Sequence, residues 1–268
     1  MIWTTQPRFS SPEGLSYVRS GDGPALVLIH GVGLRAEAWS AMLPYLAPHY
    51  KVFAVDMPGH ADSDFVSGRA LENYVEPIQK FVENLEGPVG VIGHSKGAMI
   101  ALEIAAALPD RIAGVAALNA IYRRSDAAAR SVQTRAAQLD GATQIDPTST
   151  LERWFGARPA GDMQKAAEAC GAWLTAGDPR GYADAYHVFA HHDGPADALL
   201  AGLTCPALFL TGADDPNSTP AMSEAMAKQA PSGTAISIAD AAHMVPMTHA
   251  AEVAAAILDS FVPERAKT

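Results

Sequence analysis

Cysteine is scarce in this sequence, and so are basic side chains and long apolar runs. Cys170 and Cys205 are the only cysteines and form no C-x-x-C spacing, which indicates neither a disulfide framework nor a zinc knuckle. Lys and Arg number 19 against 29 Asp and Glu, and the net charge of −10 argues against nucleic acid or an anionic membrane as a partner. No apolar run reaches the ~18 residues that span a bilayer, and residues 1–7 lack a leader pattern, so we expect a cytoplasmic protein.

Short apolar runs, by contrast, recur along the chain and alternate with helical patterns. With 49% hydrophobic and 18% charged residues, the 268-residue chain is globular and long enough for one large α/β domain or a core with an insertion. Continuous apolar runs are typical of strands buried on both faces. They occupy residues 25–29, 51–56, 89–92, 112–118, 206–211 and 235–238. The alternation predicts a parallel sheet covered by helices on both faces.

The middle of the chain differs in composition and in its predicted secondary structure. Residues 122–202 are rich in Ala, Arg and Asp and carry helical patterns but no buried-strand signature. We therefore expect a helical cap at 122–202, inserted into one α/β core formed by residues 1–121 and 203–268. No internal repeat is visible.

A candidate nucleophile follows the apolar run at 89–92. Gly93-His94-Ser95-Lys96-Gly97 fits Gly-x-Ser-x-Gly, with a strand pattern before it and an Ala-rich helix pattern after it. A sharp strand-to-helix turn forces its middle residue into a strained conformation, and a Cβ at either glycine would collide with the neighbouring element. The context predicts that the Ser95 hydroxyl projects from the end of the sheet, in front of a helix N-terminus.

A serine nucleophile needs a base and an acid that orients the base. Such partners are expected at the carboxyl ends of other strands, where sites of these sheets gather. One late strand is followed by Asp214 and Asp215, and the next is followed by Asp240 and His243. The chain order is then serine, aspartate, histidine, which points to a single fold.

Four stretches in this order resemble the α/β-hydrolase fold superfamily over essentially the whole chain. They are His30-Gly31-Val32-Gly33, Asp56-Met57-Pro58-Gly59-His60, Gly93-His94-Ser95-Lys96-Gly97, and the segments with Asp215 and His243. Within it, Leu151–Phe155 and His243–Pro246 are similar to the 3-oxoadipate enol-lactonase-like group. The resemblance implies a mostly parallel central sheet, helices on both faces and an inserted helical cap.

The resemblance also implies roles for five residues. Ser95 would be the nucleophile, His243 the general base and then acid, and Asp215 the group that fixes the imidazole. The backbone N–H groups of Val32 and Lys96 would form the oxyanion hole. Because the backbone supplies these donors, the side chains at both positions are free to vary.

Some neighbouring residues compete for these roles. Asp214 is the rival acid, but the family's spacing after Gly212 selects Asp215, and Asp240 is too near His243 to orient it. Asn119 stands where some relatives place their acid, which an amide cannot replace. The Lys96 side chain either meets an acidic substrate or forms a salt bridge to the cap.

The remaining candidates are histidines and pocket residues. His30 is expected to have a structural role, and His94 to point away from its neighbour Ser95. His187 and His191 have helical metal-ligand spacing, but no Glu completes an H-E-x-x-H pattern, so we predict no metal site. Trp154 and Met244 are predicted to contact substrate.

Together these features predict a serine hydrolase that cleaves a small or medium carboxylic ester, thioester or lactone without a cofactor. Alternatives on the same triad are hydrolysis of a carbon–carbon bond in a dicarbonyl compound and cofactor-free haloperoxidase activity. A ligand-binding receptor on this fold is a third, non-enzymatic alternative. Dehalogenase and epoxide hydrolase chemistry would need Asp in place of Ser95. The sequence leaves the substrate and the oligomeric state open.

Overall fold

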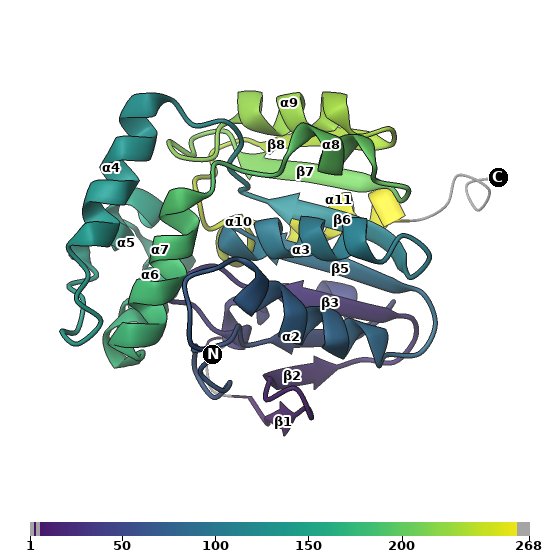
Figure 1. Cartoon of the computed structure of the whole chain (residues 1–268), viewed down its shortest axis with the longest axis horizontal. Coiled ribbons are helices and arrows are strands. Elements are labelled where there is room, and N and C mark those ends of the chain that lie inside the picture. The colour runs from purple at the N-terminus through teal and green to yellow at the C-terminus, as the bar shows by residue number, and fades with distance from the viewer. Residues whose placement is uncertain (1–2, 4–5, 262–268) are drawn as a thin grey trace.

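A mostly parallel sheet of eight strands forms the centre of the protein (Figure 1). The computed structural model describes residue 3 and residues 6–261, so the ends of the two predicted core segments lie outside the described part. The strand order is β1-β2-β4-β3-β5-β6-β7-β8, with antiparallel pairing only at β1–β2 and β2–β4 among the described residues. The strands are β1 (Phe9–Ser10), β2 (Ser16–Ser20), β3 (Ala25–Ile29), β4 (Lys51–Val55), β5 (Val89–His94), β6 (Ile112–Leu118), β7 (Ala207–Gly212) and β8 (Gly233–Ile238).

Helices cover both faces of this sheet. Along β3, Val27 and Ile29 pack into one core cluster and Leu26 and Leu28 into another, because successive side chains of a strand point to opposite faces. The first face is covered by α2 (Glu72–Glu83), α3 (Lys96–Ala107), α8 (Asp197–Ala201) and α9 (Pro220–Gln229). The second is covered by η1 (Ala36–Trp39), α1 (Leu43–Leu46) and α11 (Ala250–Phe261). The predicted doubly covered sheet is confirmed.

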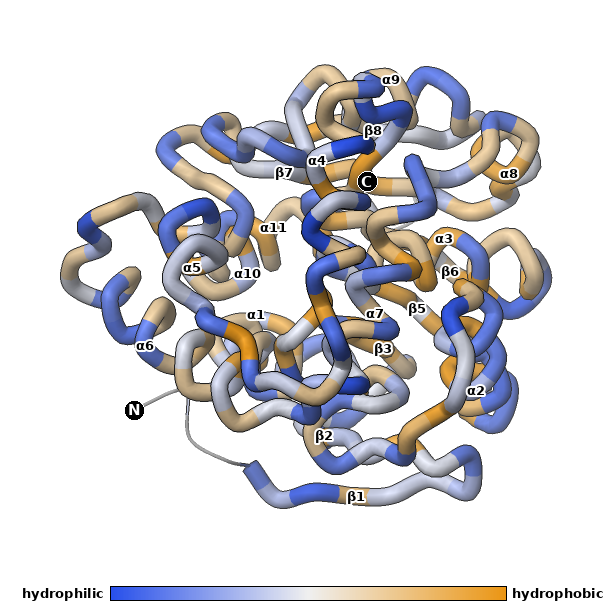
Figure 2. The backbone as a smooth tube through the Cα atoms, turned by 60° about the vertical axis from the view of Figure 1, so that its left-hand side comes forward, coloured by the Kyte–Doolittle hydropathy of each residue, from blue (hydrophilic) through white to orange (hydrophobic). Residues whose placement is uncertain are grey.

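The long segment between β6 and β7 is helical. Its helices are α4 (Asp126–Ala137), α5 (Thr148–Phe155), α6 (Gly161–Ala176) and α7 (Pro179–His191), followed by α8. In Figure 1, α4 to α7 stand beside the carboxyl ends of the parallel strands. Figure 2 shows mixed hydropathy along α4 to α6, whereas β3 and β5 are mainly apolar. Since α8 packs on α3 and α9 instead, we propose that the cap comprises α4 to α7 only.

Local chemistry explains where the helices depart from expectation. The stretch from Ala36 to Leu46, between β3 and β4, is divided into η1 and α1. Pro44 has no N–H with which to bond the carbonyl of residue 40, so the first turn cannot propagate. The short helix α10 (Val245–Thr248) was not expected; it packs on α6 and η1. In the described part of the chain, no helix is both long and apolar enough to cross a membrane.

Candidate active site

The turn between β5 and α3 holds Ser95 in a strained conformation. Ser95 has φ 56° and ψ −118°, a positive φ that costs a non-glycine residue on the order of 1–3 kcal/mol. Its N–H donates to the carbonyl of Leu118 on β6 at 2.8 Å, which fixes the turn against the sheet. A Cβ at Gly93 would overlap the carbonyl of Gly97, and a Cβ at Gly97 would overlap the carbonyl of Ile29. Both glycines are therefore required for the tight strand-to-helix turn.

Asp215 lies after β7 and contacts His243, which follows β8. Its Oδ2 is 2.7 Å from Nδ1 of His243, and the Asp215 side chain is fully buried. Oδ1 accepts from the N–H groups of Asn217 at 2.9 Å and Ser218 at 3.2 Å, and Oδ2 also accepts from Nδ2 of Asn119 at 2.8 Å. Burial alone raises the pKa of Asp215, but the charge of His243 and these hydrogen bonds lower it to about 2. The carboxylate is thus ionised at neutral pH.

The competing aspartates face solvent. Asp214 and Asp240 are both exposed, and no hydrogen bond joins either carboxylate to His243 among the described residues. Asp240 has φ 55°, a turn conformation that Asp tolerates better than most residues. Of the acids considered, the structure brings only Asp215 to the histidine.

Asn119 contacts the Asp215 carboxylate, which the sequence did not predict. It ends β6 with φ 50°, and its side-chain amide also lies 3.2 Å from Oγ1 of Thr211. The backbone carbonyl of Asn119 accepts a hydrogen bond from Oγ of Ser218 at 2.8 Å, which connects the Asp215 loop to the end of β6. An amide cannot replace the acid, but it can donate a hydrogen bond to it, as Nδ2 of Asn119 does to Asp215. An Asn at the carboxyl end of a central strand was the available signal.

His94 lies against His243. Its Nε2 is 2.7 Å from the carbonyl oxygen of His243, and the two ring centroids are 5.1 Å apart. Burial and the neighbouring charge of His243 lower the pKa of His94 to about 3, so the ring is neutral and donates from Nε2. The sequence predicts that His94 points away from Ser95; the structure places its ring against His243, and His94 is among the residues that line the cavity with Ser95.

A cavity of about 1040 Å³ opens between the sheet edge and the cap helices. Ser95, His243 and Val32 line its sheet side, and Trp154 lines its cap side. The Trp154 ring stacks on the His243 ring at 6.0 Å between centroids and 25° between planes. The predicted nucleophile, base and cap tryptophan thus share one cavity, whereas the structure does not place Met244 there. Met244 is 1% exposed and packs in a core cluster with Leu34, Ala38 and Phe155.

The first residue of α3 contributes a free backbone donor next to Ser95. Lys96 is that residue, and N–H groups in the first turn of a helix lack intrahelical acceptors. Val32, the second predicted donor, follows Gly31 in the loop after β3 and lines the cavity. A Cβ at Gly31 would lie 3.1 Å from Cβ of Ser95, which shows how closely this loop approaches the nucleophile.

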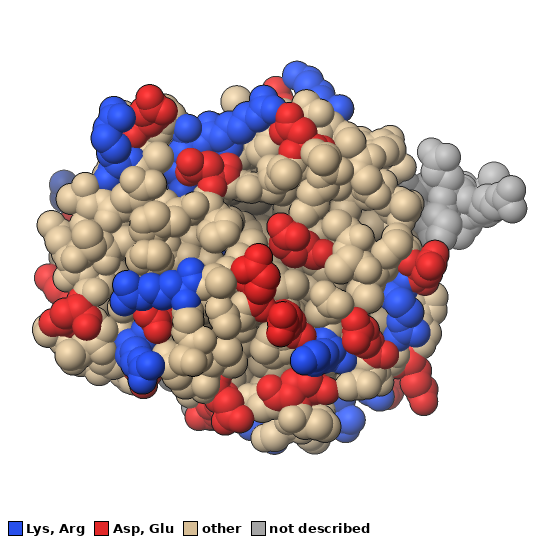
Figure 3. Space-filling model, viewed as in Figure 1, with Lys and Arg blue, Asp and Glu red and all other residues tan. Residues whose placement is uncertain are grey.

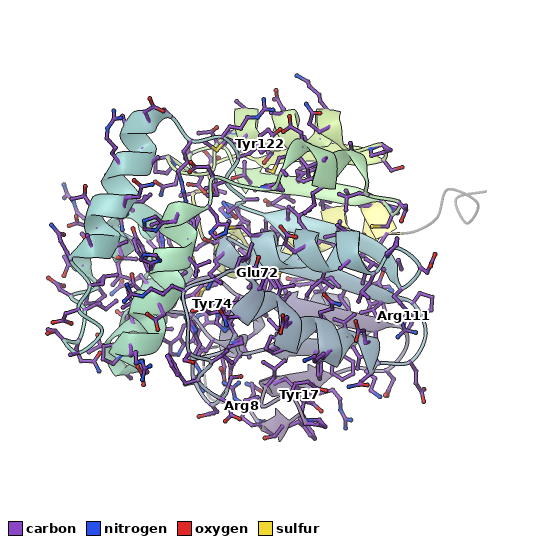
Figure 4. All side chains as sticks on the ribbon, in the orientation of Figure 1. Arg8, Tyr17, Glu72, Tyr74, Arg111 and Tyr122 are labelled. Carbon is purple, nitrogen blue, oxygen red and sulfur yellow. The ribbon has the colours of Figure 1, made fainter. Side chains whose placement is uncertain are left out.

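The side chain of Lys96 takes neither of its expected positions. It is fully buried, and its Nζ lies 2.7 Å from the ring centroid of Tyr74 on α2. Figure 4 shows Tyr74 between α2 and the cap helices. Nζ has no hydrogen-bond partner among the described residues, and the side chain does not line the cavity. Burial lowers the pKa of Lys96 well below its usual value, although the charge of Asp184 opposes this. Asp184 of the cap pairs with Arg69 at 2.7 Å instead.

His30, His187 and His191 are the remaining histidines for which the sequence suggested a role. Nε2 of His30 accepts from the N–H of Met57 at 2.9 Å, so Nδ1 carries the proton toward the carbonyl of Gly31 at 2.7 Å. This is the structural role expected of His30. His187 and His191 stack at 4.1 Å between ring centroids. Within the described part of the chain, no three His, Cys, Asp or Glu side chains are grouped to hold a metal ion.

Comparison with known proteins is consistent with this arrangement. The model of the alpha/beta hydrolase family matches residues 26–256. The chain is 40% identical over 235 residues to (E)-2-((N-methylformamido)methylene)succinate hydrolase of Acinetobacter baylyi, covering 87% of this chain and 88% of that one. It is 33% identical over 246 residues to pimeloyl-[acyl-carrier protein] methyl ester esterase of Xanthomonas campestris, covering 88% and 94%.

Solved structures show the same fold. The enol-lactonase from Burkholderia xenovorans superposes with a TM-score of 0.80 at 22% identity, covering 94% of this chain and 98% of that one. An esterase from Thermogutta terrifontis superposes with a TM-score of 0.79 at 25% identity, covering 91% and 92%. The predicted resemblance is confirmed: the chain belongs to the alpha/beta hydrolase family.

Proposed function

We propose that this hydrolase cleaves a small or medium carboxylic ester, thioester or lactone through an acyl-enzyme on Ser95. One observation carries the proposal: the cavity that holds Ser95 also holds His243, whose Nδ1 is bonded to the buried carboxylate of Asp215. A serine hydroxyl is a weak nucleophile until a base so oriented takes its proton.

The proposed reaction has two halves. Nε2 of His243 takes the proton of the Ser95 hydroxyl as Oγ attacks the substrate carbonyl, and then gives that proton to the leaving group. Water deprotonated by the same nitrogen hydrolyses the acyl-enzyme. Asp215, with a pKa of about 2, stays ionised and stabilises the imidazolium. No cofactor is needed in any step.

The developing oxyanion is assigned to the N–H groups of Val32 and Lys96. Both come from loops fixed by the sheet, one after β3 and one after β5, so they require no rearrangement during the reaction. Each such donor typically lowers the barrier by ~3 kcal/mol. The cap then acts as the roof: Trp154 covers His243 and would limit the access of water and of bulky substrates.

A second candidate is hydrolysis of an amide on a substituted succinate. It is favoured by the 40% identity to a hydrolase whose name specifies an N-methylformamido group on a methylenesuccinate. The proposed groups would attack an amide carbonyl in the same way, with His243 protonating nitrogen in place of oxygen.

The test is a p-nitrophenyl ester series of increasing acyl length on wild type and Ser95→Ala. We expect hydrolysis by the wild type and a loss of at least about 10³-fold in the variant. If no ester is cleaved, labelling of wild type with a fluorophosphonate tests the nucleophile directly. A labelled Ser95 would favour amides and lactones as substrates. No labelling would overturn the proposal.

A further inference from the structure

Two arginines of the cap face the cavity without a carboxylate partner. Nη2 of Arg135 on α4 donates to Oγ1 of Thr150 on α5 at 2.7 Å, and Nη2 of Arg153 on α5 lies 3.4 Å from the same oxygen. All three residues line the cavity that holds Ser95. Among the described residues, neither guanidinium is within ion-pair distance of an Asp or Glu. Nη1 of Arg135 also lies 3.4 Å from Oγ of Ser149, so the pair presents two positive charges beside neutral hydroxyls.

The acidic residues of the cavity do not neutralise this pair. Asp140 accepts three bonds from its own turn, from the N–H of Ala142 and from the N–H and hydroxyl of Thr143. Asp146 accepts from the N–H of Thr148 at 2.9 Å and from its hydroxyl at 2.6 Å. Each carboxylate is therefore occupied by local turn hydrogen bonds.

A third cavity-lining arginine provides a contrast. Arg124 pairs with Asp193 at 2.9 Å and also donates to the carbonyls of Phe189 and His192. Its neighbour Arg123 pairs with Asp197. Figure 3 shows basic side chains next to acidic ones at the upper left, over α4. The lack of an acidic partner therefore sets Arg135 and Arg153 apart from Arg123 and Arg124.

Packing restrains Arg135. Its guanidinium carbon lies 5.4 Å from the ring centroid of Tyr186, and Tyr186 in turn stacks on Tyr182 at 5.9 Å. Burial and the charge of Arg135 lower the pKa of Arg153 from its usual value. Two like charges held close together repel one another, and an anion between them would relieve that repulsion. Guanidinium groups bind carboxylates especially well, because two N–H groups match two oxygens.

We propose that Arg135, Arg153 and Thr150 form a subsite for a carboxylate carried by the substrate, remote from the bond that Ser95 attacks. The preferred substrates are then esters or amides of which the acyl part ends in a second carboxylate. The cavity gives the geometric basis: α5 places Arg153 directly before Trp154, which stacks on His243. This assignment rests on the proposed function, since it adds a specificity site to the same cavity.

The experiment compares mono-p-nitrophenyl adipate with p-nitrophenyl hexanoate, two esters of equal acyl length that differ in a terminal carboxylate. The variants are Arg135→Gln and Arg153→Gln. The matched control is Arg130→Gln, which removes the same charge from α4 at an exposed position outside the cavity. The measured quantity is the ratio of kcat/KM for the adipate ester to that for the hexanoate ester.

We expect wild type to prefer the adipate ester, and the ratio to fall about 10- to 100-fold in each cavity variant, mainly through KM. Arg130→Gln should keep the wild-type ratio, and Arg135→Lys should retain part of it. An unchanged ratio in both cavity variants would overturn the proposal, as would an equal fall in Arg130→Gln. Thermal melting verifies that each variant is folded. Because Arg153 is exposed, Arg153→Gln should affect folding less than Arg135→Gln does.

A separate readout keeps this proposal distinct from the proposed function. If no ester is cleaved, protection of Ser95 from fluorophosphonate by adipate is measured in place of turnover. Wild type should be protected at an adipate concentration at least about 10-fold below that needed for Arg135→Gln. If Ser95 is not labelled at all, the proposed function fails, and titration calorimetry with adipate still tests the subsite. Equal adipate affinity of wild type and both cavity variants would refute it.

Discussion

The two sides of the cavity are built on opposite principles. On the sheet side, both oxygens of Asp215 accept hydrogen bonds, and the side chains of Asp215 and His243 are 0% and 6% exposed. On the cap side, Arg135 and Arg153 contact neutral hydroxyls and have no carboxylate partner among the described residues. A buried carboxylate held by several hydrogen bonds keeps one arrangement, whereas two arginines without a carboxylate partner can still bind an anion. The comparison assigns chemistry to the sheet side and selectivity to the cap side.

The largest expected effect separates the two aspartates of the β7 loop. Asp215→Asn should lower kcat on a p-nitrophenyl ester about 10³- to 10⁴-fold, because an amide in place of the carboxylate favours the wrong imidazole tautomer. Asp214→Asn is the matched control, since it removes an equal charge one residue away, at an exposed position. Equal losses in both variants would show that charge, rather than orientation of His243, matters on the sheet side.

Acid should weaken the sheet side through its buried histidines. Burial lowers the pKa of His60 to about 4 and, with the charge of His243, that of His94 to about 3. An unfolded histidine has a pKa near 6.5, so the unfolded state binds protons first as the pH falls. Stability is therefore complete above about pH 6.5 and is lost below it, by about 2 kcal/mol per ring at pH 5.

Melting temperatures between pH 7.5 and pH 4.5 measure this loss. His94→Gln retains a donor for the carbonyl of His243 but cannot titrate, so its melting temperature should fall less steeply with acid. His49→Gln, at an exposed position, should follow the wild type. An identical pH dependence in His94→Gln and wild type would contradict the assignment.

A smaller effect is expected from the donor behind the acid. Asn119→Gly removes the amide that donates to Asp215 while tolerating φ 50° without strain. Losing a charge-assisted hydrogen bond should raise the pKa of Asp215 and lower kcat about 10-fold. The acid limb of the kcat–pH profile is the second readout. Asn119→Asp keeps the shape but places a second carboxylate beside Asp215, and should raise that pKa further.

Local sequence accounts for the parts of the site that depend on neighbours in the chain. Gly93, Ser95 and Gly97 could be interpreted in advance because a five-residue turn determines their conformation. The position of His94 could not, since its ring contacts the backbone carbonyl of His243, 149 residues away in sequence. The position of Met244 could not either, since it is buried against residues from distant parts of the chain, such as Leu34 and Phe155. The contact of Arg135 and Arg153 with the same Thr150 hydroxyl likewise depends on how α4 lies relative to α5.

The smallest effect on activity is expected at the side chain of Lys96. The proposed oxyanion donor is its backbone N–H, whereas Nζ lies over Tyr74, away from the cavity. Lys96→Met should therefore change kcat/KM by less than about 3-fold, since methionine fills a similar volume and packs well against a ring. A fall of more than about 10-fold would show instead that the amine takes part in the reaction.

Lys96→Met should stabilise the folded protein, although it should hardly change the activity. Because burial lowers the pKa of Lys96, the unfolded state binds its proton at neutral pH and the folded state is penalised. Removing the amine should therefore raise the free energy of unfolding at pH 7, and with it the melting temperature. As the pH approaches 10, the unfolded lysine also loses its proton, so the advantage of Lys96→Met should shrink. A constant difference between pH 7 and pH 10 would mean that packing around Tyr74, rather than the buried charge, sets the stability at this position.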